Sequence, residues 1–169
     1  MGAPNWELVQ HLLGEWGGSA TEIVVTDLPR SQIQHVVSVL AELPELNVLS
    51  FGYEGLDPSE PFDEAWRKRI AATQAVSCQH ALRSANGTAE HLQIYLWFDG
   101  PQLEVELVFW NDMTFPPSLS PGEYERRTHR LVSLAEACRA GVTGARCVLS
   151  TEWNGTPEEL LNRPGVVVW

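Results

Sequence analysis

Glu104 and Glu106 stand two positions apart in the apolar stretch Gln102–Phe115, and their type and spacing suggest chemistry. Residues i and i+2 of a strand lie on one face about 6.5–7 Å apart, because the chain rises ~3.3 Å per residue. Two carboxylates at this separation could be the acid and base of a glycosidase or two ligands of a metal ion. They could equally form the solvated face of a half-buried strand, so the choice depends on the elements that position them.

The residues on either side of the pair predict a β-hairpin. The stretch His91–Phe98 alternates between polar and apolar side chains, and Asp99-Gly100 is a strong two-residue turn signal. Folding about this turn produces apolar pairs on one face: Leu96 with Leu103, Ile94 with Val105, and Leu92 with Leu107. The other face then pairs Tyr95 with Glu104 and Gln93 with Glu106, with Trp97 and Trp110 nearby. Since a one-residue slip would invert both faces, both glutamates are expected on an outer surface of carboxylates and aromatic rings.

The whole chain predicts one α+β domain over residues 1–169: a mixed five- to six-stranded sheet with this central antiparallel hairpin and flanking helices. Further strands are expected at 21–26, 47–53 and 145–151 and in the final V-V-V-W. Helices are expected after the caps Asn5 and Ser31, at 63–73, and after Ser120, which opens a capping box. Residues 21–53 would then form a β-α-β unit. The segment 54–61 is interpreted as a turn-rich acidic loop.

The charge is negative and unevenly distributed. Residues 1–66 contain eleven acidic residues and one arginine, a net charge of -10, whereas the remainder contains eleven acidic and ten basic residues, a net charge of -1. A field of this sign repels nucleic acid and anionic membranes and attracts basic partners, although it also serves solubility. The N-terminus lacks a signal-peptide pattern and no apolar run approaches ~20 residues, so a cytoplasmic location is expected.

Motifs of known catalytic chemistry are absent from the sequence. The five histidines have no H-x-x-x-H or H-E-x-x-H spacing, and Cys78, Cys138 and Cys147 form no C-x-x-C pair. Cys78 and His80 are close in sequence, but a catalytic pair needs a third, orienting group, and nothing indicates one. No G-x-S-x-G elbow, phosphate-binding loop or dinucleotide fingerprint occurs. We therefore expect no catalytic residue, no metal site and no cofactor.

The hairpin sequence L-W-F-D-G-P-Q-L-E-V-E-L-V-F-W, the small acidic domain around it and the late capped helix resemble the immunity proteins of bacterial polymorphic and type VI toxin systems. Within that group the chain is similar to the immunity protein 52 family. The resemblance extends over the whole chain and rests on no diagnostic motif, so it transfers no residue role. It implies a non-catalytic inhibitor that binds one secreted nuclease-type toxin, covers its active site and so spares the producing cell.

Two parts of the chain are expected to bind this partner, namely the acidic segment after residue 53 and the outer face of the hairpin. Their residues are Glu54, Asp57, Glu60, Asp63, Glu64, Tyr95, Trp97, Glu104, Glu106 and Trp110. Two other interpretations stay open. The chain could be a small enzyme or ligand-sensing domain with a pocket between sheet and helices, or a structural adaptor with a generic acidic surface.

Overall fold

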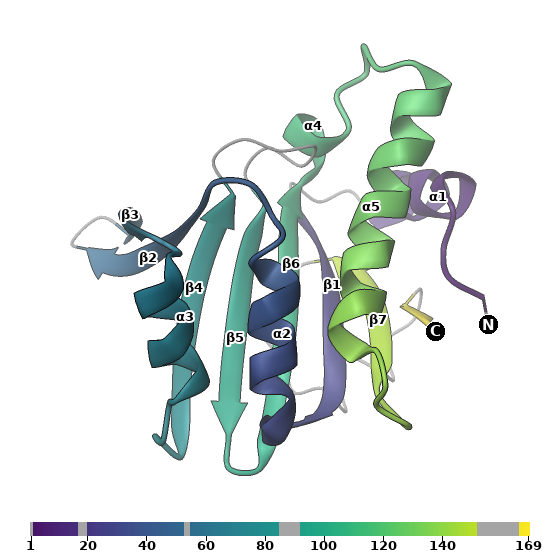
Figure 1. The fold of residues 1–169 in the computed structure, drawn as a ribbon. Coiled ribbons are helices and arrows are strands. Elements are labelled where there is room, and N and C mark those ends of the chain that lie inside the picture. The colour runs from purple at the N-terminus through teal and green to yellow at the C-terminus, as the bar shows by residue number, and fades with distance from the viewer. Residues whose placement is uncertain (1, 17–19, 53–54, 85–91, 152–165) are drawn as a thin grey trace.

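The computed structural model describes residues 2–16, 20–52, 55–84, 92–151 and 166–169 (Figure 1). In these ranges the α-helices are α1 (Trp6–Trp16), α2 (Ile33–Leu40), α3 (Glu64–Ala71), α4 (Asn111–Thr114) and α5 (Pro121–Arg139). The strands are β1 (Ala20–Pro29), β2 (Leu46–Gly52), β3 (Gly55–Pro61), β4 (Ser77–Ser84), β5 (Gln93–Asp99), β6 (Gln102–Trp110), β7 (Arg146–Thr151) and β8 (Val167–Val168). The predicted α+β class is confirmed.

All eight strands pair into one antiparallel sheet in the order β3-β2-β4-β5-β6-β1-β7-β8. The predicted mixed sheet of five to six strands is therefore wrong in number and in direction, although the predicted hairpin of β5 and β6 does lie at its centre. One additional strand is β4, whose polar sequence S-C-Q-H-A-L-R-S carries no clear strand pattern. The other is β3, which replaces the expected loop at 54–61. An edge strand tolerates Pro58 and Pro61 because only one of its sides is hydrogen-bonded.

The predicted β-α-β unit is correct in the order of its elements, β1, α2 and β2, but its two strands are not neighbours in the sheet. β1 pairs with β6 and β7, whereas β2 pairs with β3 and β4. Three strands therefore separate β1 from β2, and the alternation of antiparallel pairings makes the two point in the same direction. The connection through α2 crosses over the central strands, as Figure 1 shows.

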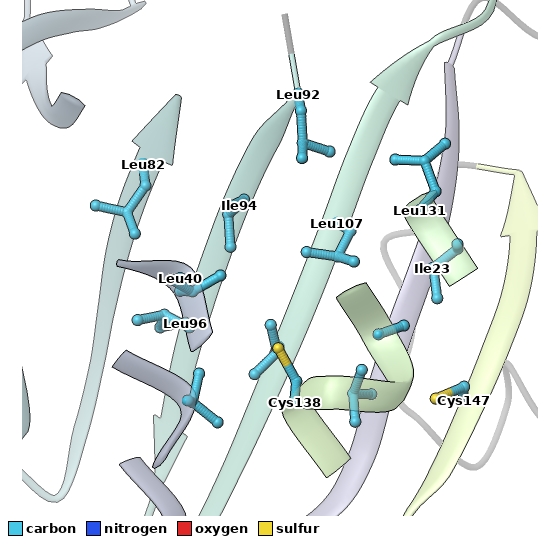
Figure 2. Close-up of a cluster of buried hydrophobic side chains, with 14 of the residues drawn as sticks. Ile23, Leu40, Leu82, Leu92, Ile94, Leu96, Leu107, Leu131, Cys138 and Cys147 are labelled. Carbon is cyan, nitrogen blue, oxygen red and sulfur yellow. The ribbon is translucent and has the colours of Figure 1, made fainter. Parts of the chain in front are cut away.

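The hydrophobic core lies between the sheet and α2, α3 and α5, which cover one of its faces (Figures 1 and 2). The inward side chains of the central hairpin, Ile94, Leu96, Val105 and Leu107, are 0% exposed. The apolar faces of α2 and α5 point into this core, with Leu40 and Cys138 among their fully buried members. We call the opposite sheet face, which points away from α2, α3 and α5, the outer face.

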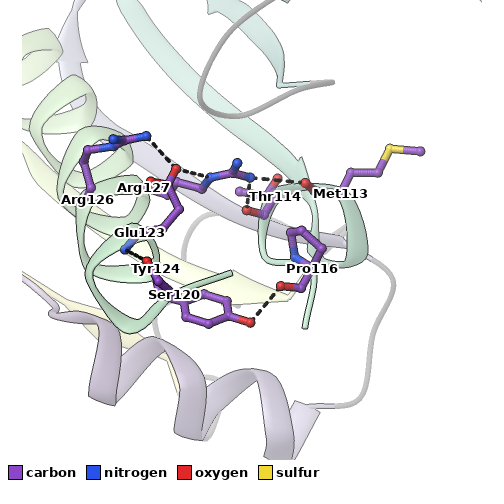
Figure 3. A network of polar contacts seen from close by, with 8 residues as sticks. All are labelled: Met113, Thr114, Pro116, Ser120, Glu123, Tyr124, Arg126 and Arg127. Carbon is purple, nitrogen blue, oxygen red and sulfur yellow. Dashed lines mark hydrogen bonds and ion pairs between the residues drawn. The ribbon is translucent and has the colours of Figure 1, made fainter. Parts of the chain in front are cut away.

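The longest helix, α5, begins at its predicted cap. The hydroxyl of Ser120 accepts a hydrogen bond from the backbone N–H of Glu123, with 3.3 Å between the heavy atoms. The carboxylate of Glu123 accepts hydrogen bonds from Arg126 at 2.6 Å and from Arg127 at 3.0 Å. Arg127 also donates to the carbonyl of Thr114 at 2.7 Å, which ties the first turns of α5 to α4 (Figure 3).

The two helices near the N-terminus differ in how they begin. Asn5 caps α1 as predicted, its side-chain oxygen accepting a backbone N–H three residues later at 3.0 Å. Ser31 does not cap α2, because a 3₁₀ turn over Arg30–Gln32 comes first and Gln32 is the N-cap residue. Arg30 explains this start, since its backbone N–H donates to the carbonyl of Pro101 at 2.7 Å and holds the chain against the hairpin turn.

The central hairpin has the predicted faces but a different register. Ile94 lies opposite Leu107, and Tyr95 lies opposite Glu106, so each residue is paired two positions further along than predicted. A shift of two residues keeps every side chain on its face, because side chains alternate with a period of two. The predicted division into a buried face and an outward face is therefore confirmed, whereas the predicted pairs are wrong.

Pro101 accounts for the change of register. The predicted turn, Asp99-Gly100, would place Pro101 in the pair that closes the hairpin, where the residue must donate an N–H that proline lacks. In the structure Asp99 pairs with Gln102, and Gly100-Pro101 forms the turn. Gly100 has a φ of +53°, which a residue without a Cβ adopts at little cost.

Candidate functional site: the outer face of the hairpin

The hairpin residues expected to bind a partner all lie on the outer face. Tyr95 and Trp97 belong to β5, whereas Glu104, Glu106 and Trp110 belong to β6, and all five alternate with buried core residues. Trp97 is 40% exposed, which is high for a side chain of its size. The predicted outward orientation of these residues is confirmed, and their role in binding stays a prediction.

Trp97 is fixed in place by its neighbours on the sheet. It lies directly opposite Glu104, and its indole Nε1 donates a hydrogen bond to Oε2 of Glu106, two residues further along β6 on the same face, at 2.8 Å. The ring of Tyr95 lies 6.2 Å from the Trp97 ring between centroids, and its hydroxyl donates to Gln93 at 2.7 Å. The two aromatic rings therefore lie side by side on the outer face, and the indole N–H of Trp97 and the hydroxyl of Tyr95 both already donate hydrogen bonds within the protein.

Glu104 is surrounded by other negative charges. Burial, followed by the carboxylates of Glu106 and Asp27, raises the pKa of Glu104 to about 7. Asp27 comes close because β1 bulges opposite Glu104, where Asp27 takes a φ of +60°. Arg146 of β7 donates to Asp27 at 2.7 Å. Three carboxylates thus share this part of the outer face, and one of them is partly protonated at neutral pH.

Glu22 is a buried carboxylate on this face and was not among the expected site residues. It is 1% exposed, and its Oε1 accepts a hydrogen bond from the hydroxyl of Ser150 on β7 at 2.8 Å. Beside it, Val24 and Val148 are also buried. The outer face therefore changes along the sheet, from partly exposed rings and acids on β5 and β6 to buried side chains on β1 and β7.

Sequence reasoning could not have included Asp27 and Glu22 with the hairpin. Glu22 is recognisable as an acid inside a strand, but its bond to Ser150 depends on the pairing of β1 with β7. Asp27 approaches Glu104 only through the pairing of β1 with β6. No local spacing in the sequence signals either contact.

The second predicted part of the binding surface, the acidic segment after residue 53, lies elsewhere. Glu54 and the side chain of Asp57 fall outside the described residues. The remaining three acids of this set have local partners around β3 and α3, on the side of the sheet that the helices cover.

Each of these three acids contributes to the start of α3. The carboxylate of Glu60 accepts a hydrogen bond from the indole N–H of Trp66. Asp63 is the N-cap and accepts the backbone N–H of Trp66 at 2.9 Å. Glu64 pairs with Lys68, one helical turn further along α3, at 2.6 Å. The two predicted parts therefore do not form one surface, and the hairpin supplies the continuous one.

The cysteines and histidine that could suggest catalysis lie on the helix side. Cys138 and Cys147 are buried, which raises their pKa values to about 12 and about 11, so both stay protonated at neutral pH. Burial also raises the pKa of Cys78 and lowers that of His80, whose Nε2 lies 3.1 Å from the Thr73 hydroxyl. Within the described ranges, no three His, Cys, Asp or Glu side chains are grouped to hold a metal ion.

Comparison with known proteins adds no relative. No protein family, no curated protein and no solved structure matches this chain. Among the helices described here, none combines the length and apolar character needed to cross a bilayer.

Proposed function

We propose that this protein is a non-catalytic immunity protein that binds a basic, nuclease-type toxin through the outer face of its central hairpin. The observation that carries the proposal is the exposed Trp97, held by Glu106 and flanked by Glu104. Binding energy at interfaces concentrates on large aromatic side chains, and side chains that are fixed beforehand lose less entropy on binding. The hairpin supplies such an anchor at the middle of a broad sheet.

The charge of the chain supports a basic partner. A nuclease presents positive charge to its phosphate substrate, so a protein with a net charge of -11 is attracted to that same surface and competes with nucleic acid for it. A lysine or arginine of the toxin could lie over the Trp97 ring and beside Glu104. Such a cation favours the ionised form of Glu104, so we expect affinity to rise between about pH 5.5 and 7.5.

A pair of glutamates, one with a raised pKa, would also suit a hydrolytic enzyme. Catalysis additionally needs a concave site that holds the substrate and excludes water. Two pockets lined by described residues lie on the helix side of the sheet, and neither contains Glu104 or Glu106. The outer face of the hairpin is therefore better suited to binding a protein surface than to chemistry.

The test is to co-express the chain with the product of the adjacent gene and to measure binding rates and residual nuclease activity. The test variant is Glu104→Gln/Glu106→Gln, and the matched control is Glu7→Gln/Glu64→Gln, which removes the same charge away from the outer face. We expect the test variant to bind more slowly at low salt and to dissociate faster, because it loses charge at the interface itself. Trp97→Ala should dissociate faster without a change in the salt dependence of association.

Three outcomes would overturn the proposal. A neighbouring product that fails to bind, or that lacks nuclease activity, would exclude the toxin as partner. Equal effects of the test and control variants would mean that only net charge matters, as in an adaptor with a generic acidic surface. Turnover of a substrate by the purified chain that is lost in Glu104→Gln would instead identify an enzyme.

A further inference from the structure

A pocket of about 360 Å³ lies between α2 and α5, at the ends of β4 and β5. Ser84 and Leu92, at these strand ends, are among the residues that line it. The pocket follows from the different lengths of the two helices, because α2 has 8 residues and α5 has 19. At 1.5 Å per residue these lengths are about 12 Å and about 28 Å, so α5 continues beside a part of the sheet that α2 does not reach.

The walls of this pocket are apolar and its mouth is charged. Val39 and Leu43 line the side of α2, and Leu131, Leu134 and Ala137 line the side of α5. Figure 2 shows Leu92 and Leu131 at the same end of the core cluster. Two ionic side chains also line the pocket, one from the segment after α2 and one from α5.

These two side chains are Glu42, just after α2, and Arg130 of α5. Both are exposed, and neither makes an ion pair or a hydrogen bond through its side chain with the rest of the described chain. An apolar ligand would form no ion pair with either of these side chains. An organic acid would be attracted by Arg130 but repelled by Glu42. An amine would be attracted by Glu42 but repelled by Arg130.

We infer that this pocket binds a free amino acid with a large apolar side chain, its carboxylate at Arg130, its ammonium group at Glu42 and its side chain between α2 and α5. A zwitterion is the ligand class that satisfies both charges at the mouth. The pocket volume is at the lower end of the range for small-molecule sites, which suits a ligand the size of phenylalanine. This inference does not depend on the proposed toxin binding.

The experiment is a calorimetric titration of the full chain with L-phenylalanine and three analogues that each lack one feature. 3-Phenylpropionate lacks the ammonium group, 2-phenylethylamine lacks the carboxylate, and L-alanine lacks the apolar side chain. We expect a dissociation constant on the order of 0.1–1 mM for L-phenylalanine, given its small number of atoms. Each analogue should bind at least about fivefold more weakly, because each loses one charged or apolar contact.

Variants of the two charged residues separate their roles. Arg130→Gln should weaken L-phenylalanine and leave 2-phenylethylamine no weaker, whereas Glu42→Gln should weaken L-phenylalanine and leave 3-phenylpropionate no weaker. Both side chains are exposed, so neither substitution should disturb folding. Arg126→Gln is the matched control, since it removes the same charge one helical turn earlier on α5 and outside the pocket.

The inference is overturned if L-phenylalanine gives no saturable binding. It is also overturned if either single-charge analogue binds as tightly as L-phenylalanine, because the zwitterion would then not be recognised. Equal weakening by Arg126→Gln and Arg130→Gln would show that binding occurs outside the pocket. Loss of toxin binding has no bearing on these results, which keeps the two proposals distinguishable.

Discussion

Trp97 donates its indole N–H to Glu106 across the central hairpin, with 2.8 Å between Nε1 and Oε2. The same Glu106 carboxylate helps to raise the pKa of Glu104, the residue directly opposite Trp97. One carboxylate thus influences both the orientation of the exposed ring and the protonation of its neighbour. The three side chains are therefore expected to respond together to substitution.

The first prediction concerns the bond between Trp97 and Glu106. A double-mutant cycle with Trp97→Phe and Glu106→Ala, which removes the acceptor, should give a coupling energy of about 0.5–1.5 kcal/mol, the usual range for a partly exposed hydrogen bond. The free energy of unfolding of the four proteins, measured with urea, provides the values. A parallel cycle of Trp97→Phe with Glu64→Ala should show no coupling, and equal coupling in both cycles would contradict a direct interaction.

The second prediction concerns the pH dependence of stability. The pKa of Glu104 is about 7 in the folded chain and 4.5 as its ordinary value, so between these values the folded state keeps a proton that the unfolded state releases. The contribution of Glu104 to the free energy of unfolding therefore falls as pH rises from about 4.5 to 7, by about 1–3 kcal/mol after allowance for solvent screening.

Glu104→Gln should remove this dependence and raise the free energy of unfolding at about pH 8 by the same amount. The measurement is urea unfolding at several pH values, with Glu64→Gln as the control on an exposed acid away from this cluster. A variant whose stability falls with pH as steeply as that of the parent chain would show that Glu104 titrates normally.

The third prediction tests the hairpin turn. Gly100→Ala should destabilise the protein by about 1 kcal/mol or more, because the φ of +53° is unfavourable for a residue with a Cβ. Gly122→Ala is a matched control, since an added Cβ meets no atom within 4 Å at either position and Gly122 lies in α5. The control should be neutral or slightly stabilising, because alanine favours helix. Equal destabilisation at both positions would contradict the assigned turn.

The fourth prediction separates two arginines that contact the same glutamate. Arg127→Gln should lower the free energy of unfolding by about 1–3 kcal/mol, because Arg127 also bonds the carbonyl of the buried Thr114. Arg126→Gln should have a much smaller effect, since Arg126 is mostly exposed. Thermal unfolding of the two variants gives the comparison. A larger effect at Arg126 would mean that the link between α4 and α5 contributes little.

Local patterns account for what the sequence predicted correctly. The alternation along β5 and β6 required that Glu104 and Glu106 share the outer face, because a mismatched face would expose Ile94 and Leu107. The caps of α1 and α5 were predictable because Asn5 and Ser120 bond backbone groups only three residues away. Because such contacts join residues close together in the chain, the local sequence is enough to predict them.

The register of the hairpin was also within reach of the sequence, because the missing N–H of Pro101 excludes the predicted pairs. The strands β3 and β4 were not, since their polar residues become strands only by pairing with β2 and β5. Strand propensity depends strongly on such neighbours.

The sequence by itself determined which residues of the hairpin face outward and which form the core, because a strand alternates its side chains with a fixed period. It also determined the net negative charge of the chain. Only the tertiary structure decided that Asp27 lies beside Glu104, that the acids at α3 lie away from the outer face, and that α5 extends past α2 to leave a pocket. These arrangements depend on strand order and relative helix length, which arise from burying one shared core rather than from any local stretch of residues.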